Sequence, residues 1–592
     1  MRTDNHRLEL TEVLDLLLAC GLIRAEDRDA LRFERPRGGG DPHPFSIIGE
    51  RRLSRADRPQ QVLTAEALTE WMADEAGLPF LRIDPLKIDV ASVCEVVSHA
   101  YAETYRILPV KVEGGEVTIA TAEPFETEWV SVLEQAMRIR IKRVLANPAD
   151  IVRYLAEFYS LARSIRQAVN LHAGAAGGMV GNFEQLVQLG SRKSLDANDQ
   201  AIVHIVDWML QYAFEQRASD IHIEPRREVG NVRFRIDGVM HAVYQAPSAV
   251  MAAMTSRIKL MGRMDVVEKR RPQDGRIKTR SSTGEEIELR LSTMPTAFGE
   301  KLVLRIFDPT VLLKSFPELG FGREDERRWR DLFTQPHGII LVTGPTGSGK
   351  TTTLYSTLRE LATPETNVCT VEDPIEMVYP YLNQMQVQPG IGLDFATGVR
   401  TLLRQDPDVI MVGEIRDLET AEMAVQAALT GHLVLSTLHT NDAPSAIVRL
   451  LDLGVPPYLI RSTVLGVLAQ RLVRTLCPHC RRRAPIDEAQ WKALVKPWTS
   501  AVPGRANEPV GCLECRMTGY FGRAGIYEML VMTPALRALI AVDADMARVR
   551  ELAVREGMQP LRLAGARQIA AGVTTVDEVL RNTPPAAESG RA

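Results

Sequence analysis

The fold of this chain is decided by Gly338-Ile-Ile-Leu-Val-Thr-Gly-Pro-Thr-Gly-Ser-Gly-Lys-Thr-Thr-Thr353, which joins a short apolar strand to a glycine-rich loop and a helix. Its second half matches G-x-x-x-x-G-K-[ST], the pattern of a phosphate loop. In such a loop the glycines turn backbone N–H groups toward a phosphate chain, and the lysine places a point charge on the outer phosphates. The sequence therefore predicts a nucleotide site formed by Gly344, Pro345, Thr346, Gly347, Ser348, Gly349, Lys350, Thr351 and Thr352.

The helix expected from Lys350 to about Leu361 turns its positive N-terminal end toward the same anion. Thr351 follows the lysine directly, and its hydroxyl suits the Mg²⁺ that accompanies a nucleoside triphosphate. ATP and Mg²⁺ are therefore the expected cofactors of this part of the chain.

Further apolar strands of the same region are each followed by side chains that phosphate chemistry can use. The carboxyl ends of neighbouring parallel strands meet at one edge of a sheet. A carboxylate there can hold Mg²⁺ or orient the attacking water, and a histidine can donate a hydrogen bond to the terminal phosphate. Solvated strand-end groups and an acidic turn are the plainer alternatives. The candidates are Glu414 after residues 409–413, Glu372 and Glu376 at and beyond residues 368–372, and His439 after residues 433–437.

Four arginines are candidates for contacts with the phosphates, because a guanidinium neutralises phosphate oxygens bidentately. Arg400 and Arg404 are spaced i, i+4 just before the strand that precedes Glu414, so we expect them on one helical face, and Arg290 and Arg305 lie on strands of the preceding region. A solvated or salt-bridged surface arginine is the alternative for each of them.

Four of the seven cysteines form two C-x-x-C pairs, and these predict a metal site. Cys477, Cys480, Cys512 and Cys515 supply four thiolates, which is the ligand set of a structural Zn²⁺ with no open position. A redox motif would need only one such pair. The segment between the pairs looks poor in apolar residues, so we expect it to depend on the metal for folding.

The composition is that of a globular protein of several domains, with 592 residues, 45% hydrophobic residues and a net charge of −4. No apolar run reaches 18 residues, and the polar N-terminus does not resemble a signal peptide. We therefore expect a cytoplasmic protein with at most a peripheral membrane contact. The acidic balance, and basic residues 269–271 without interleaved aromatic side chains, disfavour nucleic acid as a partner.

Periodicity and composition divide the chain into successive parts. Residues 165–198 include a glycine-rich run with few core-forming side chains, which is typical of a linker. Between residues 313 and 476 the strand and helix signals alternate, as in a parallel sheet covered on both faces. In order we expect a helical partner-docking region (1–75), an α+β domain (76–164), a flexible linker (165–198), a second α+β domain (199–312), an α/β nucleotide-binding core (313–476), a zinc insert (477–520), a C-terminal helical part (521–583) and a disordered tail (584–592).

The motifs together resemble those of the bacterial secretion ATPase superfamily, the motors of type II secretion and type IV pilus assembly. The matching segments are Asp220-Ile-His-Ile-Glu-Pro225, Arg235-Ile-Asp-Gly238, Arg271-Pro-Gln-Asp-Gly-Arg276, the phosphate loop, the acidic box 371–376, residues 403–417, the histidine box to His439, and Gln470-Arg-Leu-Val-Arg474 before the cysteines. They extend over about residues 199–580.

The resemblance implies a RecA-like P-loop core, a preceding PAS-like domain that completes the nucleotide site, and a ring of six subunits. It also implies that Glu414 is the catalytic carboxylate, that Glu372 and Glu376 belong to an acidic box, and that His439 reads the γ-phosphate. The four arginines would surround the phosphates, with Arg290 and Arg305 acting from a neighbouring subunit. The implied partners are an inner-membrane platform protein and a membrane-anchored docking protein.

Some relatives bind cyclic di-GMP through paired R-L-G-x-x-L-L-x-x-G repeats in the front module, the part of the chain before the linker (residues 1–164 here). Aligned on Gly21, this chain has Glu12-Val-Leu14 where Arg-Leu-Gly would stand, and residues 43–48 match no better. A glutamate in place of the arginine would repel the phosphates of the dinucleotide. We therefore expect no tight binding of cyclic di-GMP.

The leading hypothesis from the sequence is a hexameric ATPase that drives pseudopilus assembly and protein export in type II secretion. A type IV pilus assembly ATPase is the alternative within the same family. A nucleic-acid translocase on the same fold, and a nucleotide-gated scaffold without turnover, are rivals from other functional classes.

Overall fold

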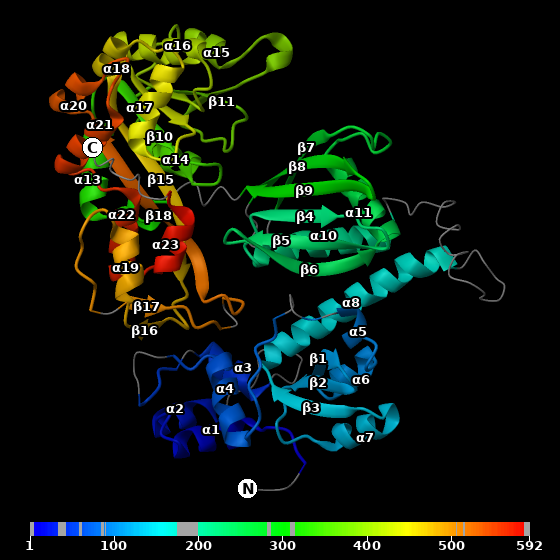
Figure 1. The fold of residues 1–592 in the computed structure, drawn as a ribbon. Helices are drawn as coiled ribbons and strands as arrows, with labels where there is room; N and C mark the ends of the chain where they lie inside the picture. Colours follow the sequence, from blue (N-terminus) through cyan, green and yellow to red (C-terminus); the bar gives the residue numbers. More distant parts are fainter. Residues whose placement is uncertain are drawn as a thin grey trace. The chain divides into compact units, whose positions relative to one another are not determined.

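The computed structural model describes residues 5–32, 43–51, 53–57, 62–84, 88, 90–173, 199–280, 286–307, 314–504, 506–512 and 515–584. It divides into two compact units, Met1–Ile306 and Phe307–Ala592, each of which is treated separately below (Figure 1). Within the described residues, none of the helices has the length and apolar composition needed to span a bilayer.

The first unit begins with a small helical bundle. The apolar stripes of these helices face one shared core. Its fully buried members include Leu14 and Leu17 of the first helix, Phe45 of the third and Met72 of the fourth. The helices are α1 (Leu10–Ala19), α2 (Ala25–Leu31), α3 (Pro44–Glu50) and α4 (Ala65–Ala76).

A three-stranded α+β part follows the bundle. Its sheet has the order β1-β2-β3, with β1 and β2 antiparallel around a turn in which Gly114 and Gly115 both take positive φ, and with β2 and β3 parallel. The elements are α5 (Val90–Val93), α6 (His99–Thr104), β1 (Ile107–Glu113), β2 (Glu116–Thr121), α7 (Glu128–Met137), β3 (Arg140–Leu145) and α8 (Pro148–Ala173).

Helix α8 corrects the expected start of the linker. Residues 165–173 continue the helix, because this stretch contains no glycine or proline until Gly174. The remainder of the predicted linker, residues 174–198, lies outside the described residues, as do residues 585–592 of the predicted tail.

The second α+β part is a six-stranded antiparallel sheet in the order β6-β5-β4-β9-β8-β7, contacted by α11 and by α10. Helix α10 reaches the sheet through ring contacts of Trp208 with Tyr244 and of Tyr212 with Phe234. Ile221 and Ile223 of β4 are buried in the apolar cluster, and the alternate residues Asp220 and Glu224 are buried on the other face, where they pair with arginines of β9 and β5. The elements are α10 (Gln200–Glu215), β4 (Asp220–Glu224), β5 (Val229–Ile236), β6 (Val239–Pro247), α11 (Ser248–Met261), β7 (Gln273–Arg280), β8 (Glu286–Thr296) and β9 (Gly299–Phe307).

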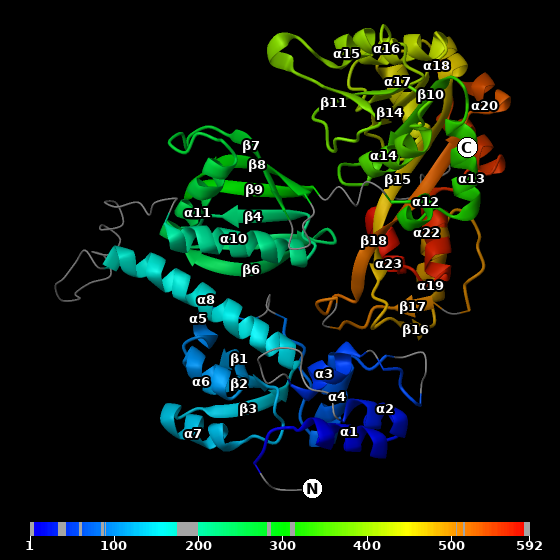
Figure 2. The ribbon, with the colours of Figure 1, turned by 180° about the vertical axis from the view of Figure 1, so that it is seen from behind.

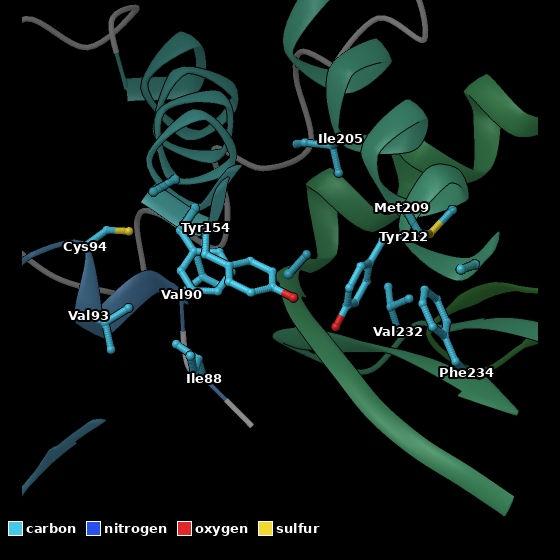
Figure 3. Packing of buried hydrophobic residues seen from close by; sticks show 14 of the residues in the cluster. Ile88, Val90, Val93, Cys94, Tyr154, Ile205, Met209, Tyr212, Val232 and Phe234 are labelled. Atoms are coloured by element: carbon cyan, nitrogen blue, oxygen red, sulfur yellow. The ribbon is translucent and has the colours of Figure 1, made fainter. Parts of the chain in front are cut away.

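Helices α8 and α10 join these two parts of the first unit into one buried cluster. Figure 3 shows Tyr154 of α8 on one side of this cluster and Ile205, Met209 and Tyr212 of α10 on the other. Arg153 of α8 also forms an ion pair with Glu215 at the end of α10.

The second unit is built on a seven-stranded sheet in the order β12-β11-β13-β14-β10-β15-β18. Neighbouring strands are parallel except for β18, which runs antiparallel to β15. Separate buried clusters cover the two faces: one includes Ala421 and Ile447, and the other includes Trp329 and Leu354. The fold class predicted from the sequence, an α/β P-loop core with helices on both faces of the sheet, is therefore confirmed.

The strands of this sheet are β10 (Gly338–Thr343), β11 (Val368–Glu372), β12 (Asn383–Gln386), β13 (Val409–Val412), β14 (Leu433–Leu438), β15 (Val464–Leu476) and β18 (Tyr520–Val531). The helices of the core are α12 (Phe316–Leu319), α13 (Arg323–Phe333), α14 (Lys350–Leu361), α15 (Phe395–Leu402), α16 (Leu418–Leu429), α17 (Ala443–Asp452) and α18 (Pro457–Thr463), with a short 3₁₀ turn at Pro389–Ile391. Figure 2 shows the same elements from behind.

The segment after β15 differs from expectation in two ways. Trp491, Leu494 and Val495 of the insert are buried in one cluster with Ile569 and Val579, so the insert shares an apolar core with the C-terminal helices, which its composition did not indicate; its dependence on the metal stays a prediction. The part expected to be helical from residue 521 begins with a strand, β18, because it pairs along most of β15. The remaining elements are β16 (Arg482–Ala484), α19 (Glu488–Val495), β17 (Ala506–Glu508), α20 (Pro534–Leu539), α21 (Met546–Arg555), α22 (Leu561–Ala570) and α23 (Val576–Asn582).

Candidate nucleotide site

The phosphate loop connects β10 to α14 in the second unit. Every residue of β10 is buried, and the chain leaves the strand through Gly344 with a φ of 151°. Gly347 and Gly349 take φ values of 79° and 87°, in the left-handed region that other residues rarely adopt. The three glycines therefore allow the backbone to curl between strand and helix, as an anion-binding loop requires.

Two side chains of the loop fit a bound phosphate chain. Lys350 Nζ donates to the backbone oxygen of Gly344 at 2.8 Å, so the ammonium lies over the loop. Burial, partly offset by Glu414, lowers the pKa of Lys350 to about 8. Ser348 Oγ is buried, and it has no hydrogen-bond partner among the described residues. A site with a cation and an unused hydroxyl suits an anionic ligand such as the phosphates of ATP.

Glu414 lies at the same edge of the sheet, one residue beyond the Gly413 that follows β13. Its carboxylate forms an ion pair with Arg416, and its Oε2 lies 3.3 Å from Nε2 of His439, the residue that follows β14. Thr437 Oγ1 donates to the carbonyl of Gly413 at 2.8 Å, which ties the two strand ends together. The structure thus brings Glu414 and His439 into contact, and both Glu414 and Glu376 act electrostatically on Lys350.

Glu372 has a different environment from Glu414. It is 4% exposed, and its carboxylate accepts hydrogen bonds from Tyr355 (2.7 Å), Thr370 (2.6 Å) and Gln384 (3.1 Å). These contacts link β11 to α14 and β12. Glu372 therefore fixes the walls of the site, and three of its acceptor positions are already used by neutral donors.

The four predicted arginines lie in both units. Arg400 of α15 donates to Glu419 at 3.2 Å, and Arg404 lies exposed beyond the end of α15, so the two do not share a helical face. In the first unit, Arg305 Nε donates to Asp220 Oδ1 at 3.1 Å, and Arg290 lies 3.7 Å from Glu288. A phosphate role for any of them remains a prediction.

Sequence reasoning missed two residues of β15 that contact the loop. Gln470 Nε2 donates to the carbonyl of Ser348 at 2.6 Å, and Arg471 lies beside Gly344. The motif Gln470-Arg-Leu-Val-Arg474 contributed to the family resemblance, but nothing in its pattern indicated that it would run next to the phosphate loop.

The four cysteines converge after β15 and before β18. Cys477 and Cys512 Sγ lie 3.7 Å apart, Cys480 and Cys515 3.8 Å, and Cys512 and Cys515 3.7 Å. A tetrahedron with Zn–S bonds of about 2.3 Å has edges of about 3.8 Å, so the sulfur positions fit Zn²⁺. Burial would raise the pKa of the Cys515 thiol, but N–H donors from Cys512 and Gly519 lower it.

The front module bears on the cyclic di-GMP prediction. Glu12 stands where the repeat would have arginine, and it accepts from Nε2 of His6 at 3.1 Å. Val13 and Leu14 are fully buried in the bundle core, and His43 of the second half is also buried, where burial lowers its pKa to about 3.

The parallel α/β sheet, the phosphate loop after its strand β10 and the strand-end pair Glu414 and His439 define a P-loop nucleoside triphosphatase. A model of the family of type II/IV secretion system proteins matches residues 196–581, and a model of the MshEN domain matches residues 76–165. The chain belongs to the type II/IV secretion system protein family, as its motifs predicted, and it is an ATPase of that family.

Three relatives show how far the similarity extends. The chain is 52% identical to the type IV pilus assembly ATPase TfpB of Acinetobacter baylyi, over 96% of this chain and 98% of the relative. It is 39% identical to the type IV pilus assembly ATPase PilB of Myxococcus xanthus, over 88% and 91%. It is 47% identical to type II secretion system protein E of Aeromonas hydrophila, over 68% and 79%.

Proposed function

We propose that this chain is the motor ATPase of type IV pilus assembly. The observation that carries the proposal is the match to an Acinetobacter pilus assembly ATPase, which extends over 96% of the chain at 52% identity and so includes the front module. The front module is the part expected to dock a partner, and similarity there bears on which machine the motor serves.

Type II secretion, the leading hypothesis from the sequence, is the second candidate. It is supported by the 47% identity to a type II secretion protein E over 68% of this chain. Deleting the gene and scoring surface pili against secreted enzymes tests the choice. Loss of pili with normal secretion supports our proposal, and loss of secretion with normal pili replaces it.

The proposed chemistry is Mg²⁺-dependent hydrolysis of ATP. The loop N–H groups and Lys350 would bind the phosphates, Thr351 would hold Mg²⁺, and the metal would neutralise charge on the phosphate oxygens. Glu414 would orient the attacking water and accept its proton at a carboxylate oxygen. His439 would donate a hydrogen bond to the γ-phosphate, while its contact with Glu414 keeps the two side chains adjacent.

The remaining roles follow from the family. Arg290, Arg305, Arg400 and Arg404 would surround the phosphates, with the first two acting from a neighbouring subunit of a hexamer. Four thiolates would hold a structural Zn²⁺ that cross-links the two knuckles, the short turns formed by the C-x-x-C pairs at residues 477–480 and 512–515. The ring would work at the cytoplasmic face of the inner membrane, against a platform protein and a membrane-anchored docking protein, without nucleic acid.

We also propose that the front module binds no cyclic di-GMP tightly. Support comes from Glu12, which replaces the expected arginine and already interacts with His6. Calorimetry of the full chain with cyclic di-GMP should therefore give no submicromolar affinity. A submicromolar dissociation constant would overturn this proposal.

A further inference from the structure

Strand β15 continues beside the phosphate loop after β10 has ended. The parallel pairing of β10 and β15 extends to Thr343 and Ala469, and β15 then runs on to Leu476. A Cβ atom on Gly344 would lie 2.6 Å from the carbonyl oxygen of Gln470, which is closer than real Cβ contacts. The loop is therefore packed directly onto the backbone of β15, at the two residues that follow Ala469.

The first of these residues, Gln470, is 1% exposed and spans the loop with a single amide. Its Nε2 donates to the carbonyl of Ser348 at 2.6 Å, and its Oε1 accepts from Oγ1 of Thr353 at 2.8 Å. Ser348 belongs to the loop and Thr353 to the first turn of α14. One side chain thus fixes the loop relative to the helix whose N-terminal end faces the anion.

The second residue, Arg471, is also buried, and as its successor on the strand it points to the opposite face. Its guanidinium donates to the carbonyl of Gln470 at 3.1 Å, to the carbonyl of Asn441 at 2.8 Å and to Oδ1 of Asn441 at 3.2 Å. Asn441 lies two residues after His439. Thr440, between them, donates its N–H to Oγ1 of Thr343 at 2.8 Å, immediately before the loop.

We propose that Gln470 and Arg471 are positioning residues for ATP hydrolysis: Gln470 holds the phosphate loop in the shape that binds nucleotide, and Arg471 holds the His439 segment against that loop. The proposal rests on the proposed hydrolysis of ATP. The two residues act through Ser348, Thr353 and Asn441, so each should affect a different step.

Loss of the Gln470 contacts should mainly weaken nucleotide binding, because the loop then pays an ordering cost on binding. We expect Gln470→Leu to raise the dissociation constant for ADP about tenfold, the size of about one lost hydrogen bond in a buried site. Loss of the hydrogen bonds from the Arg471 guanidinium to Asn441 should mainly lower kcat, because the segment that carries His439 is then poorly placed. We expect Arg471→Lys to lower kcat about tenfold or more with ADP affinity within about twofold of wild type.

The experiment uses the full-length chain and compares ADP affinity by calorimetry, steady-state kcat and KM for ATP, and the thermal unfolding midpoint. Gln568→Leu and Arg474→Lys are matched controls, because Gln568 bonds to Gly320 and Arg474, on the same strand, bonds to Glu578. Neither control should change affinity or kcat by more than about twofold.

If Gln470→Leu fails to fold, Gln470→Glu and Thr353→Val decide the question. The glutamate keeps an acceptor for Thr353 but cannot donate to Ser348. Valine removes the Thr353 hydroxyl, which bonds to Gln470 and also interacts with Tyr527, and it leaves the Gln470 bond to Ser348 in place. Weaker ADP binding in both supports the proposal. A lower melting temperature with unchanged affinity and unchanged kcat overturns it, because the residues would then serve stability alone. ADP affinity also separates this proposal from the proposed function. A wild-type chain that binds ADP without hydrolysing ATP would contradict the proposed function and the turnover role of Arg471, whereas the role of Gln470 would still be decided by the ADP affinity of its variants.

Discussion

Glu372 is the last residue of β11, and Glu414 lies just beyond the end of the neighbouring strand β13. The surroundings of the two carboxylates suit different tasks. The carboxylate of Glu372 is buried and accepts from three neutral donors, so few lone pairs remain for a proton or a metal. The carboxylate of Glu414 instead contacts Arg416 and His439 and acts on Lys350. Of the two, Glu414 is the one whose position suits general base catalysis.

Glu414→Gln should therefore leave nucleotide binding intact and lower kcat by a factor of about 100 or more, because the amide cannot accept a proton. Phosphate release and ADP calorimetry on the same preparation measure the two effects. Glu372→Gln is the comparison variant: it should lower the melting temperature, with kcat reduced about tenfold at most. Equal turnover of Glu414→Gln and wild type would remove Glu414 from its catalytic role.

Lys350 should make nucleotide affinity depend on pH. Its pKa of about 8 in the free site means that the ammonium, the form that attracts phosphate, is lost as pH rises above 8. A bound phosphate favours the charged form and raises this pKa. The dissociation constant for ADP should therefore be flat below pH 8 and rise by up to about tenfold per pH unit above it. Calorimetry between pH 7 and about pH 9.5 checks this, and Lys350→Arg, charged throughout, should flatten the profile.

Among the elements, those with a strong local pattern could be predicted and those defined by distant pairing could not. The apolar strand before Gly344 and the helix after Gly349 carry their own signals, and so do the two cysteine pairs. Strand β18 is different: its residues become a strand because β15 offers a long antiparallel partner, and no local period shows that partner. The contact of Gln470 with the loop was missed for the same reason, since it joins residues 122 positions apart.

The zinc insert should lose its metal without losing its whole structure. Trp491 and Leu494 are anchored in an apolar cluster that includes residues of α22 and α23, so the insert does not depend on the metal alone. Cys512→Ser, or chelation, should abolish bound Zn²⁺ and make the two knuckles accessible to protease, with ADP affinity within about twofold of wild type. Metal analysis, limited proteolysis and calorimetry measure these outcomes. A metal-free chain that binds ADP tenfold more weakly would show that the insert supports the nucleotide site.

At the scale of the whole molecule, the main question is whether Arg305 serves its own subunit or the next one in the proposed ring. Arg305 is held by Asp220 on the charged face of the sheet in the first unit, whereas Lys350 lies in the second unit.

Lys350→Ala and Arg305→Ala should each be nearly inactive alone. When the two variants are mixed in equal amounts and reassembled, an interface is intact only if one subunit supplies Lys350 and its neighbour supplies Arg305. Action between subunits should therefore restore up to about a quarter of wild-type turnover, since random mixing makes about a quarter of the interfaces intact. If Arg305 acts within its own subunit, every site in the mixture stays defective and no turnover returns; mixing Lys350→Ala with Glu414→Gln, two changes in the same unit, provides that baseline.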